Sequence, residues 1–515
     1  MKRGHLFPVA GFVLLVILLA GSNHAAASPA DWPMYRNNPL HTGVATDVVS
    51  PPLSLKWKQT FGGAVDSSPA VVGSRVYVGS DDGNLYALDS ATGNIIWAFK
   101  EIAPLPVTLA WDSSPVVATV GGQTVIFAGN GNNYFYAIRD DGATATKLWF
   151  YTDAGGPAPI VSSPAVTSIA GTDVVVFGSN VGRLYALVAS TGALYGGWLA
   201  NPLVIGGIFR TSPAILGQTI FIGNTNGLLY AVNLGNGVQL WTAPAAAVGP
   251  INSSPAVASV IITGVPTNLV FFGADDNTLR AVVASNGAPQ WQFAVGNQIR
   301  SSPAIATIPN PPAACTPGPT LVVIFGSDDN NLYAVRALDG TPCWTFPSTG
   351  AQPFHSSPTV SGQTVYVGSD DNNIYAVDIN TGTWRWSYPA LGPVGDAIVA
   401  PNPVISGTTL YVGSKDQSLY AFEPVTVTAS TTQVVTVSTT TTTATISTGT
   451  TQTLTNMTTL ITTLTSSTWI TTVVPPSSVP GFPIESILAG VIAGLAALGF
   501  LRQRHRRQEA RSSGD

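Results

Sequence analysis

Short apolar runs separated by polar turns recur along the middle of the chain. In the first such unit, residues 76–80 (VYVGS) precede a turn at 81–83 (DDG), residues 85–88 (LYAL) precede a turn at 92–93 (TG), and the unit ends on 95–97 (IIW). One more short run, after a Ser-Ser-Pro tripeptide, opens the unit. Apolar runs of this length between turn residues are typical of β-strands. Each unit therefore predicts four short antiparallel strands and shows no helical period.

Eight copies of this unit lie between residues 50 and 424. Each opens on Ser-Ser-Pro or a related tripeptide, and the prolines stand at positions 69, 115, 164, 213, 255, 303, 358 and 403. Internal repeats of this period indicate solenoids, propellers or arrays. A four-stranded sheet cannot bury both faces alone, so neighbouring sheets must stack on it. The repeats predict an all-β fold, an eight-bladed β-propeller over residues 28–424.

Tryptophan positions predict how the ring closes. Seven units end on a tryptophan in the expected outermost strand, at positions 97, 149, 198, 241, 291, 344 and 386, and the eighth ends near Phe422 without one. Residues 55–61, which include Trp57, precede the first unit and belong to no blade. We expect this segment to be the outer strand of the eighth blade, so that the N-terminal strand closes the ring and leaves no open sheet edge.

The N-terminal residues 1–27 are predicted to be a signal peptide. They combine basic Lys2 and Arg3, a short apolar run and small residues at 25–27 (AAA). This order is typical of a cleaved secretory signal, and an uncleaved membrane anchor is the alternative.

The C-terminal part predicts a surface anchor. Residues 425–480 are rich in Thr and Ser and hold no charged residue, which predicts a disordered, O-glycosylated stalk that carries a sequon at Asn456. Residues 481–501 predict one transmembrane helix, and the arginines of residues 502–515 predict a basic cytoplasmic tail. The propeller would then lie outside the cell, anchored to the membrane by a single pass.

Composition and charge narrow the classes of function. Only 9% of residues are charged and the formal net charge is −5, and residues 28–480 hold 14 Lys and Arg against 23 Asp and Glu. Nucleic-acid binding needs a basic face, so we predict no nucleic-acid partner. Two cysteines and five histidines exclude zinc fingers and a disulfide-rich scaffold.

The repeated unit resembles the pyrroloquinoline-quinone (PQQ)-type propeller repeat. Its pattern Ala-x-Asp-x-x-Thr-Gly-x-x-x-Trp is matched in full at residues 87–97 and 376–386, whereas the Asp is replaced by Val188, Asn233, Val283 and Arg336 in other blades. Residues 31–36 (DWPMYR) and 41–43 (HTG) look like the start of this family. The C-terminal anchor is similar to the sorting tail of archaeal cell-surface proteins.

The resemblance implies two kinds of function. The family includes quinone-dependent alcohol and sugar dehydrogenases and also non-enzymatic scaffolds of outer-membrane barrel assembly, and the fold does not choose between them. The dehydrogenases hold the quinone and a calcium ion over the channel, and the large ones place a vicinal Cys-Cys pair beside it. This chain has no such pair, and neither Glu101 nor Glu423 stands in a recognisable ligand context. We therefore predict no bound cofactor, with PQQ and calcium as the alternative.

One position in each repeat is free of the repeat pattern and holds the candidate site. The residue just before each Ser-Ser-Pro slot should lie at one mouth of the channel, and these residues include Asp66, Asp112, Arg210, Asn252, Arg300 and His355, with Val161 and Ala400 completing the set. A concave mouth with convergent polar groups is the default ligand site. A solvated rim that binds nothing is the alternative.

Paired acids at 81, 275, 328 and 370 raise the possibility of calcium. We predict instead that they form Asx turns, in which the side chain satisfies backbone N–H groups. Calcium needs six to eight oxygens, more than two adjacent aspartates supply.

Cys315 and Cys343 both fall in the sixth unit. One lies in the insert between its first two expected strands and the other in the turn before its last. These two loops should share a face of the blade, so we expect a disulfide, with two buried thiols as the alternative. Neither cysteine has a catalytic context, and no Ser-His-Asp arrangement or GxSxG elbow is present in the sequence. No catalytic or metal-binding residue is predicted.

These features predict a cell-surface-anchored propeller that acts as a non-enzymatic binding or scaffold module. Its partner would be a surface protein, a glycan or a small ligand. The first alternative is a PQQ- and calcium-dependent dehydrogenase. The second is a structural component of a cell-surface layer.

Overall fold

The computed structural model describes residues 31–101, 110–152, 156, 158–244, 249–315, 319–389 and 401–425, and three short strands beyond them. The predicted signal peptide, transmembrane helix and cytoplasmic tail, together with Ala400 and Asn456, lie outside these residues. Within the described part of the chain, no helix is long and apolar enough to cross a bilayer.

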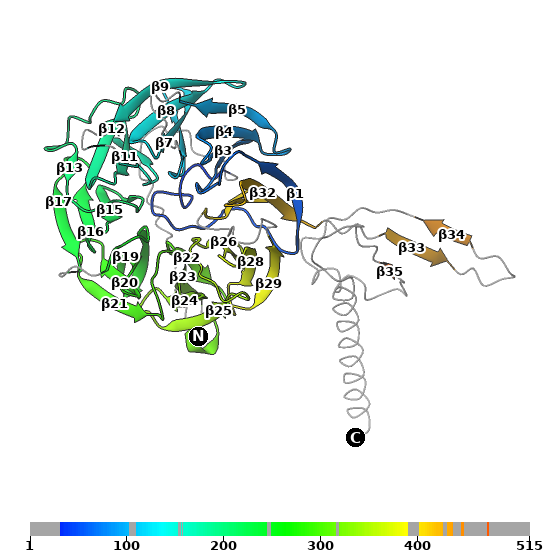
Figure 1. Ribbon diagram of the computed structural model, residues 1–515. Helices are drawn as coiled ribbons and strands as arrows, with labels where there is room; N and C mark the ends of the chain where they lie inside the picture. The colour runs from blue at the N-terminus through cyan, green and yellow to red at the C-terminus, as the bar shows by residue number, and fades with distance from the viewer. Residues whose placement is uncertain are drawn as a thin grey trace, which may run out of the picture.

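Eight four-stranded antiparallel sheets are arranged in a ring, as Figure 1 shows. Blades 1 to 4 consist, from the channel outward, of β2 (Ala70–Val72), β3 (Arg75–Gly79), β4 (Asn84–Asp89) and β5 (Ile95–Lys100); β6 (Val116–Val120), β7 (Gln123–Gly129), β8 (Tyr134–Asp140) and β9 (Ala145–Thr152); β10 (Ala165–Ile169), β11 (Thr172–Gly178), β12 (Arg183–Val188) and β13 (Leu203–Val204); and β14 (Ala214–Leu216), β15 (Thr219–Gly223), β16 (Leu229–Asn233) and β17 (Gln239–Ala243).

Blades 5 to 8 repeat this order. They consist of β18 (Ala256–Ile262), β19 (Val265–Ala274), β20 (Thr278–Val283) and β21 (Pro289–Ala294); β22 (Ala304–Ile308), β23 (Thr320–Gly326), β24 (Asn331–Arg336) and β25 (Pro342–Pro347), with the 3₁₀ turn η1 (Ala313–Cys315); β26 (Thr359–Ser361), β27 (Thr364–Gly368), β28 (Asn373–Asp378) and β29 (Trp384–Pro389); and β30 (Val404–Ser406), β31 (Thr409–Ser414), β32 (Ser418–Pro424) and β1 (Leu53–Thr60). The predicted eight-bladed, all-β propeller is confirmed.

The ring closes through the N-terminal strand, as the sequence predicts. β1 pairs antiparallel with β32 and supplies the outer strand of blade 8. The indole N–H of Trp57 donates to the carbonyl of Ser90 in blade 1 over 3.1 Å. This bond and the strand pairing join the first and last blades, so no sheet is left without its fourth strand.

Outer-strand tryptophans join neighbouring blades in a repeated way. The ring of Trp57 lies against Gly93 in the Thr-Gly turn of blade 1, where an added Cβ would meet the indole at 2.6 Å and φ is +75°. Only glycine suits both the close approach and that φ. The Thr-Gly of the repeat pattern is therefore an interblade contact and has no need of a ligand to explain it.

Blade 3 departs from the predicted pattern. Its outer strand β13 has only two residues, and Trp198 lies in a turn before it, not in the strand as expected. The side chain of Asn201 takes over part of the strand's role, because its amide N–H donates to the carbonyl of Ala186 over 2.6 Å. Trp198 still donates to the carbonyl of Leu234 in the next blade over 2.7 Å, so the interblade contact survives without the strand.

The segment before β1 lines the inside of the ring. Residues 32–43 accept backbone N–H bonds from the innermost strands of six blades, donated by Val71, Val117, Ile215, Val257, Ile305 and Val360. Arg36 lies fully inside and donates to the carbonyls of Pro303 and Pro358 at 2.9 and 2.6 Å. Burial lowers its pKa to about 10. The segment thus covers the free edges of the inner strands and runs across the channel.

The Thr-rich region is not wholly irregular. Within it, β33 (Ser430–Val435), β34 (Ala444–Ser447) and β35 (Thr471–Thr472) form a small antiparallel sheet, where the sequence predicts a disordered stalk. β-Branched threonine and valine favour extended backbone, which accounts for the strands. The rest of this region lies outside the described residues.

Candidate functional site

A closed ring of hydrogen bonds encircles the channel. In each blade, the backbone N–H of the second residue of the Ser-Ser-Pro slot donates to the side chain of the equivalent residue in the next blade, at 2.9 or 3.0 Å. Seven of these residues are serines and the eighth is Asn402, which donates back to Ser68 of blade 1 over 2.9 Å. The repeated serine is therefore a structural link between blades, and we refer to these eight residues as the serine ring.

The serine ring surrounds the floor of a cavity of about 500 Å³ at one mouth of the channel. Tyr35 of the N-terminal segment contributes to the floor, with its hydroxyl 2.9 Å from the hydroxyl of Ser302. The walls contain all six residues that the sequence analysis selected, Asp66, Asp112, Arg210, Asn252, Arg300 and His355, together with Val161 and Lys415. The structure thus brings these residues together, and we call this space the mouth cavity.

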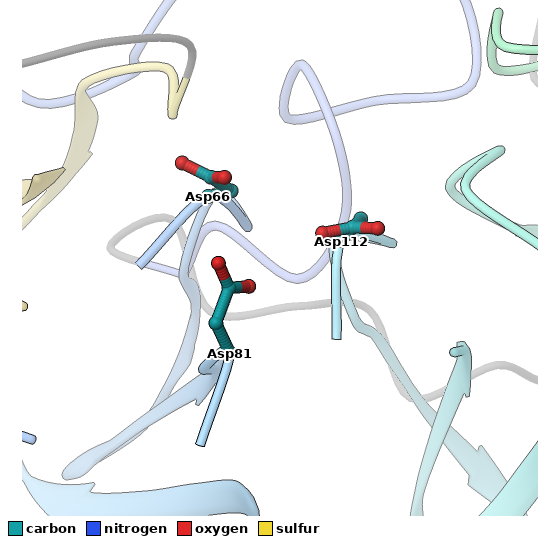
Figure 2. A group of neighbouring side chains, drawn as sticks. All are labelled: Asp66, Asp81 and Asp112. Carbon is teal, nitrogen blue, oxygen red and sulfur yellow. The ribbon is translucent and has the colours of Figure 1, made fainter. Parts of the chain in front are cut away.

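Three carboxylates meet on one side of the mouth cavity. One oxygen each of Asp66, Asp81 and Asp112 lies within 4.8 Å of the other two, and Figure 2 shows Asp81 pointing up between the others. Burial raises the pKa of all three carboxyls, and each also senses a negative neighbour within the group; the pKa of Asp81 rises to about 6. We call this group the acid triad.

Close packing at the end of β3 makes this approach possible. A Cβ on Gly79 would lie 2.4 Å from the Cβ of Trp111, so only glycine lets the segment that carries Asp112 come so near. One oxygen of Asp66 and one of Asp81 are buried without a hydrogen-bond partner among the described residues. The acid triad therefore gathers negative charge that these residues do not neutralise in pairs.

The opposite wall is a chain of alternating charges from blade 5 to blade 7. Asn252 donates to Asp275 over 3.0 Å, and Arg300 lies 3.9 Å from Asp275 and 3.4 Å from Asp328. His355 lies between two carboxylates, 3.0 Å from Asp328 and 2.8 Å from Asp370. Burial opposes the imidazolium, but these two contacts outweigh it and raise the pKa of His355 to about 9. This wall is therefore internally paired at neutral pH.

Arg210 differs from the other cations of the cavity. It lines both the mouth cavity and an adjoining pocket, and it makes no hydrogen bond or ion pair with the residues that the structure describes. A guanidinium carries five N–H donors in a planar fork. Arg210 thus presents an unshared positive charge in blade 4.

The sequence analysis missed a second set of wall residues. Asp81, Asp275, Asp328, Asp370 and Lys415 occupy one equivalent position, just after the second strand of their blades. The prediction that both acids of each pair form Asx turns is wrong for the first member, because its side chain turns into the cavity region. The available signal was the position itself, two residues after the glycine that ends the second strand.

The second member of the pair does form the predicted turn in three blades. Asp82, Asp329 and Asp371 each accept the N–H of the asparagine two residues later, at 2.9, 3.1 and 3.1 Å. In blade 5, Asp276 instead pairs with Arg280. The paired acids thus divide their roles between the turn and the cavity.

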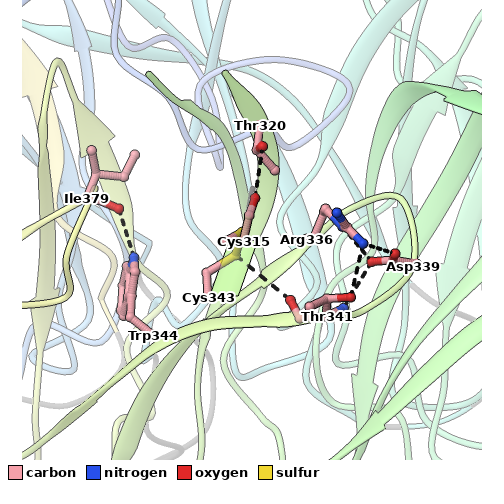
Figure 3. The surroundings of a disulfide bond; sticks show 8 residues. All are labelled: Cys315, Thr320, Arg336, Asp339, Thr341, Cys343, Trp344 and Ile379. Carbon is pink, nitrogen blue, oxygen red and sulfur yellow. Dashed lines mark hydrogen bonds and ion pairs between the residues drawn. A yellow bond between two sulfur atoms is a disulfide. The ribbon is translucent and has the colours of Figure 1, made fainter. Parts of the chain in front are cut away.

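Figure 3 shows a disulfide between Cys315 and Cys343, with Cα atoms 4.8 Å apart. Cys315 ends η1, as the predicted insert requires, but Cys343 lies inside β25 and not in the turn before it. Both cysteines are buried and belong to blade 6, and neither lines the mouth cavity. The disulfide ties the insert to the outer strand.

The fold raises the question of whether a quinone and calcium fit here. The acid triad offers oxygens that could hold a cation, but calcium takes six to eight oxygens and the triad supplies three carboxylates. A flat tricyclic quinone needs extended apolar or aromatic surface, whereas Tyr35 is the one aromatic and Val161 the one aliphatic side chain among the lining residues. The described lining therefore does not fit the quinone.

Comparison with known proteins identifies the family. The model of the PQQ-type repeat family described as outer membrane protein assembly factor BamB matches residues 54–140, 132–250 and 275–458. The chain is 26% identical over 240 residues to outer membrane protein assembly factor BamB of Burkholderia pseudomallei, covering 45% of this chain and 56% of that protein. It is 36% identical over 116 residues to quinohemoprotein alcohol dehydrogenase ADH IIB of Pseudomonas putida, covering 21% and 16%.

Among solved structures, quinohemoprotein alcohol dehydrogenase from Comamonas testosteroni superposes with a TM-score of 0.59 at 15% identity, over 80% of this chain and 83% of that one. At that identity the likeness concerns the fold. The two relatives matched by sequence carry different kinds of activity in their names, and this chain spans only part of each. Since the family model covers most of the residues, the chain belongs to the PQQ-type repeat family.

Proposed function

We propose that this propeller is a non-enzymatic binding module, displayed outside the cell, that takes a small polar ligand in the mouth cavity. The observation that carries the proposal is the construction of that cavity. The serine ring and Tyr35 close its floor, and charged side chains from blades 1, 2, 4, 5, 6, 7 and 8 converge on its walls. A solvated rim would need neither a closed floor nor an unshared cation such as Arg210.

The side chains around the mouth cavity are poorly suited to acid–base or nucleophilic chemistry. A general base should have a pKa near the working pH and a free lone pair. His355 is held as an imidazolium between Asp328 and Asp370. The serines of the ring use their oxygens to accept backbone N–H bonds, and none is paired with a histidine in the described residues. Binding is the better use of this set.

The location rests on the sequence. A signal peptide at 1–27, a Thr-rich stretch and an anchor at 481–501 with a basic tail would hold the propeller on the outer side of a membrane. A docking role is the second candidate, because one relative is named an outer membrane protein assembly factor. The flat faces and outer blade edges would serve that role, and the mouth cavity would not be required.

The test is a thermal-shift and calorimetric screen of the full-length protein. It uses small charged and polar compounds, with PQQ plus calcium as a separate arm. We expect at least one small compound to bind one-to-one, and we expect Arg210→Gln to weaken it while the unfolding temperature stays the same. Saturable PQQ binding with dye-linked alcohol or sugar oxidation would overturn the proposal in favour of a dehydrogenase. Self-assembly into sheets in sedimentation experiments would favour a structural layer instead.

A further inference from the structure

We propose that the ligand of the mouth cavity is a small zwitterion that carries a primary ammonium and an oxyanion. The acid triad of Asp66, Asp81 and Asp112 would bind the ammonium. Arg210 and the hydroxyls of the serine ring would bind the oxyanion, a carboxylate in an amino-acid-like compound. This inference rests on the proposed function and names the ligand class of the same cavity.

The acid triad has the dimensions of an ammonium cage. A primary ammonium offers three N–H donors, and tetrahedral geometry with N···O distances near 2.8 Å places three acceptors about 4.6 Å apart. The triad oxygens lie within 4.8 Å of one another, which admits that spacing. One oxygen of Asp66 and one of Asp81 are buried without a partner, so the donors of an ammonium would meet acceptors not already in use.

A divalent metal suits the same place less well. Calcium takes six to eight oxygens at 2.3–2.6 Å, and the hydroxyl oxygens nearest in the sequence to the triad, those of Ser68 and Ser114, already accept backbone N–H bonds. Lys415 also lines this cavity, and its charge is felt by all three carboxyls of the triad. A neighbouring positive charge repels a divalent ion twice as strongly as a monovalent one.

The serine ring supplies a second, independent sign of a ligand. Six of its hydroxyls accept a backbone N–H but have no acceptor for their own proton among the described residues. They belong to Ser68, Ser114, Ser163, Ser212, Ser254 and Ser357, are only 3–5% exposed, and line the cavity. A hydroxyl can accept and donate at once. The floor is therefore a circle of buried donors that an oxyanion would satisfy.

The two poles are separated in a way that orients a zwitterion. Asp66 and Asp81 belong to blade 1 and Asp112 to blade 2, whereas the unshared guanidinium of Arg210 belongs to blade 4 (Figure 1). The wall between Asn252 and Asp370 is already paired internally and offers little net charge. A ligand with only one charge would leave one pole unmatched.

The test is calorimetry on the full-length protein at pH 7 with single compounds. The zwitterionic probes are glycine and the linear ω-amino acids up to 6-aminohexanoate. The comparison probes are propylamine, butyrate, glycine betaine, glucose and calcium chloride. We expect an amino acid of one chain length to bind one-to-one, and every comparison probe to bind at least tenfold more weakly. Glycine betaine matters most, because it keeps both charges but has no N–H donors.

Variants locate the two poles. Asp112→Asn and Arg210→Gln should each weaken the amino acid at least tenfold, while Asp141→Asn, which changes an exposed acid in an outer loop of blade 2, should leave affinity unchanged. Lys415→Met should strengthen binding, because it removes a competing cation. A merely structural role of Lys415 would predict the opposite, so this variant keeps the test valid even if an Asp variant folds poorly.

The outcomes separate this inference from the proposed function. Tighter binding of glucose or butyrate than of any amino acid would overturn the zwitterion and leave a binding module. Calcium binding that is lost in Asp112→Asn, without amino-acid binding, would make the triad a metal site and overturn the inference. Equal binding of glycine betaine would overturn the ammonium cage. PQQ-dependent oxidation would overturn both proposals.

Discussion

The charge of His355 yields a quantitative prediction about pH. The imidazole is mostly buried, with its side chain 21% exposed, and lies between Asp328 and Asp370. Its pKa rises from 6.5 to about 9, which corresponds to about 3 kcal/mol of stability at low pH. The folded-state pKa is higher than that of the unfolded chain. The contribution is therefore complete below pH 6.5 and is lost as the pH rises through about 9.

Two measurements test this. An NMR titration of the imidazole signals should show His355 with a midpoint near 9. His41 is the internal control, because burial lowers its pKa to about 3 and it should not titrate in the neutral range. Urea unfolding should show His355→Gln less stable than the original protein by about 3 kcal/mol at pH 6.

The difference between the two proteins should shrink markedly at pH 10. There the imidazole is neutral and no longer compensates the two carboxylates. Comparing the two proteins at each pH cancels the titration of other groups. A midpoint near 6.5, or a stability difference that is the same at pH 6 and pH 10, would refute the reasoning and would mean that His355 is not held between charged partners.

Three further predictions concern the ring. Ser212→Ala leaves the buried N–H of Ser163 without an acceptor and should cost about 1–3 kcal/mol in urea unfolding. Trp57→Ala removes the interblade contact of the closing strand and should cost about 3–5 kcal/mol, with hydrogen exchange in β1 accelerating first. Replacing Cys315 and Cys343 together by serine removes a cross-link over 28 residues and should cost about 3–4 kcal/mol in urea unfolding.

Matched variants control these experiments. Ser285 is exposed, and Ser285→Ala should change stability by less than about 0.5 kcal/mol. Trp384 is 50% exposed on β29, and Trp384→Ala should cost far less than the change at Trp57. The double cysteine variant should be insensitive to reductant. Equal losses in test and control variants would show that the named contacts do not hold the ring together.

Much of the fold could be predicted because it is encoded locally and repeatedly. Apolar runs, turn residues and the Ser-Ser-Pro slot state the strand order of each blade, and eight copies state the number of blades. The lone strand around Trp57 closes the ring because a blade with three strands would leave an open edge. Blade 3 shows the limit of this reasoning, since Trp198 keeps its contact while the strand around it is replaced by the side chain of Asn201.

The candidate site was only half visible in the sequence. The position before each Ser-Ser-Pro slot identified six wall residues, because a position freed from the repeat pattern stands out against it. The second set, from Asp81 to Lys415, was hidden by turn chemistry, since adjacent aspartates can both form Asx turns and nothing local says which one turns toward the channel.

By itself, the sequence determined the number and order of the blades, the strand that closes the ring and the residues that face one mouth of the channel. Only the tertiary structure decided how those residues divide the charge between them. It brought Tyr35 to Ser302, 267 residues away, and it gathered the acid triad apart from Arg210. The physical reason is one of range. Hydrophobic period and turn preference act over a few residues, whereas the pairing of charges across a ring depends on distances that exist only after the blades have closed.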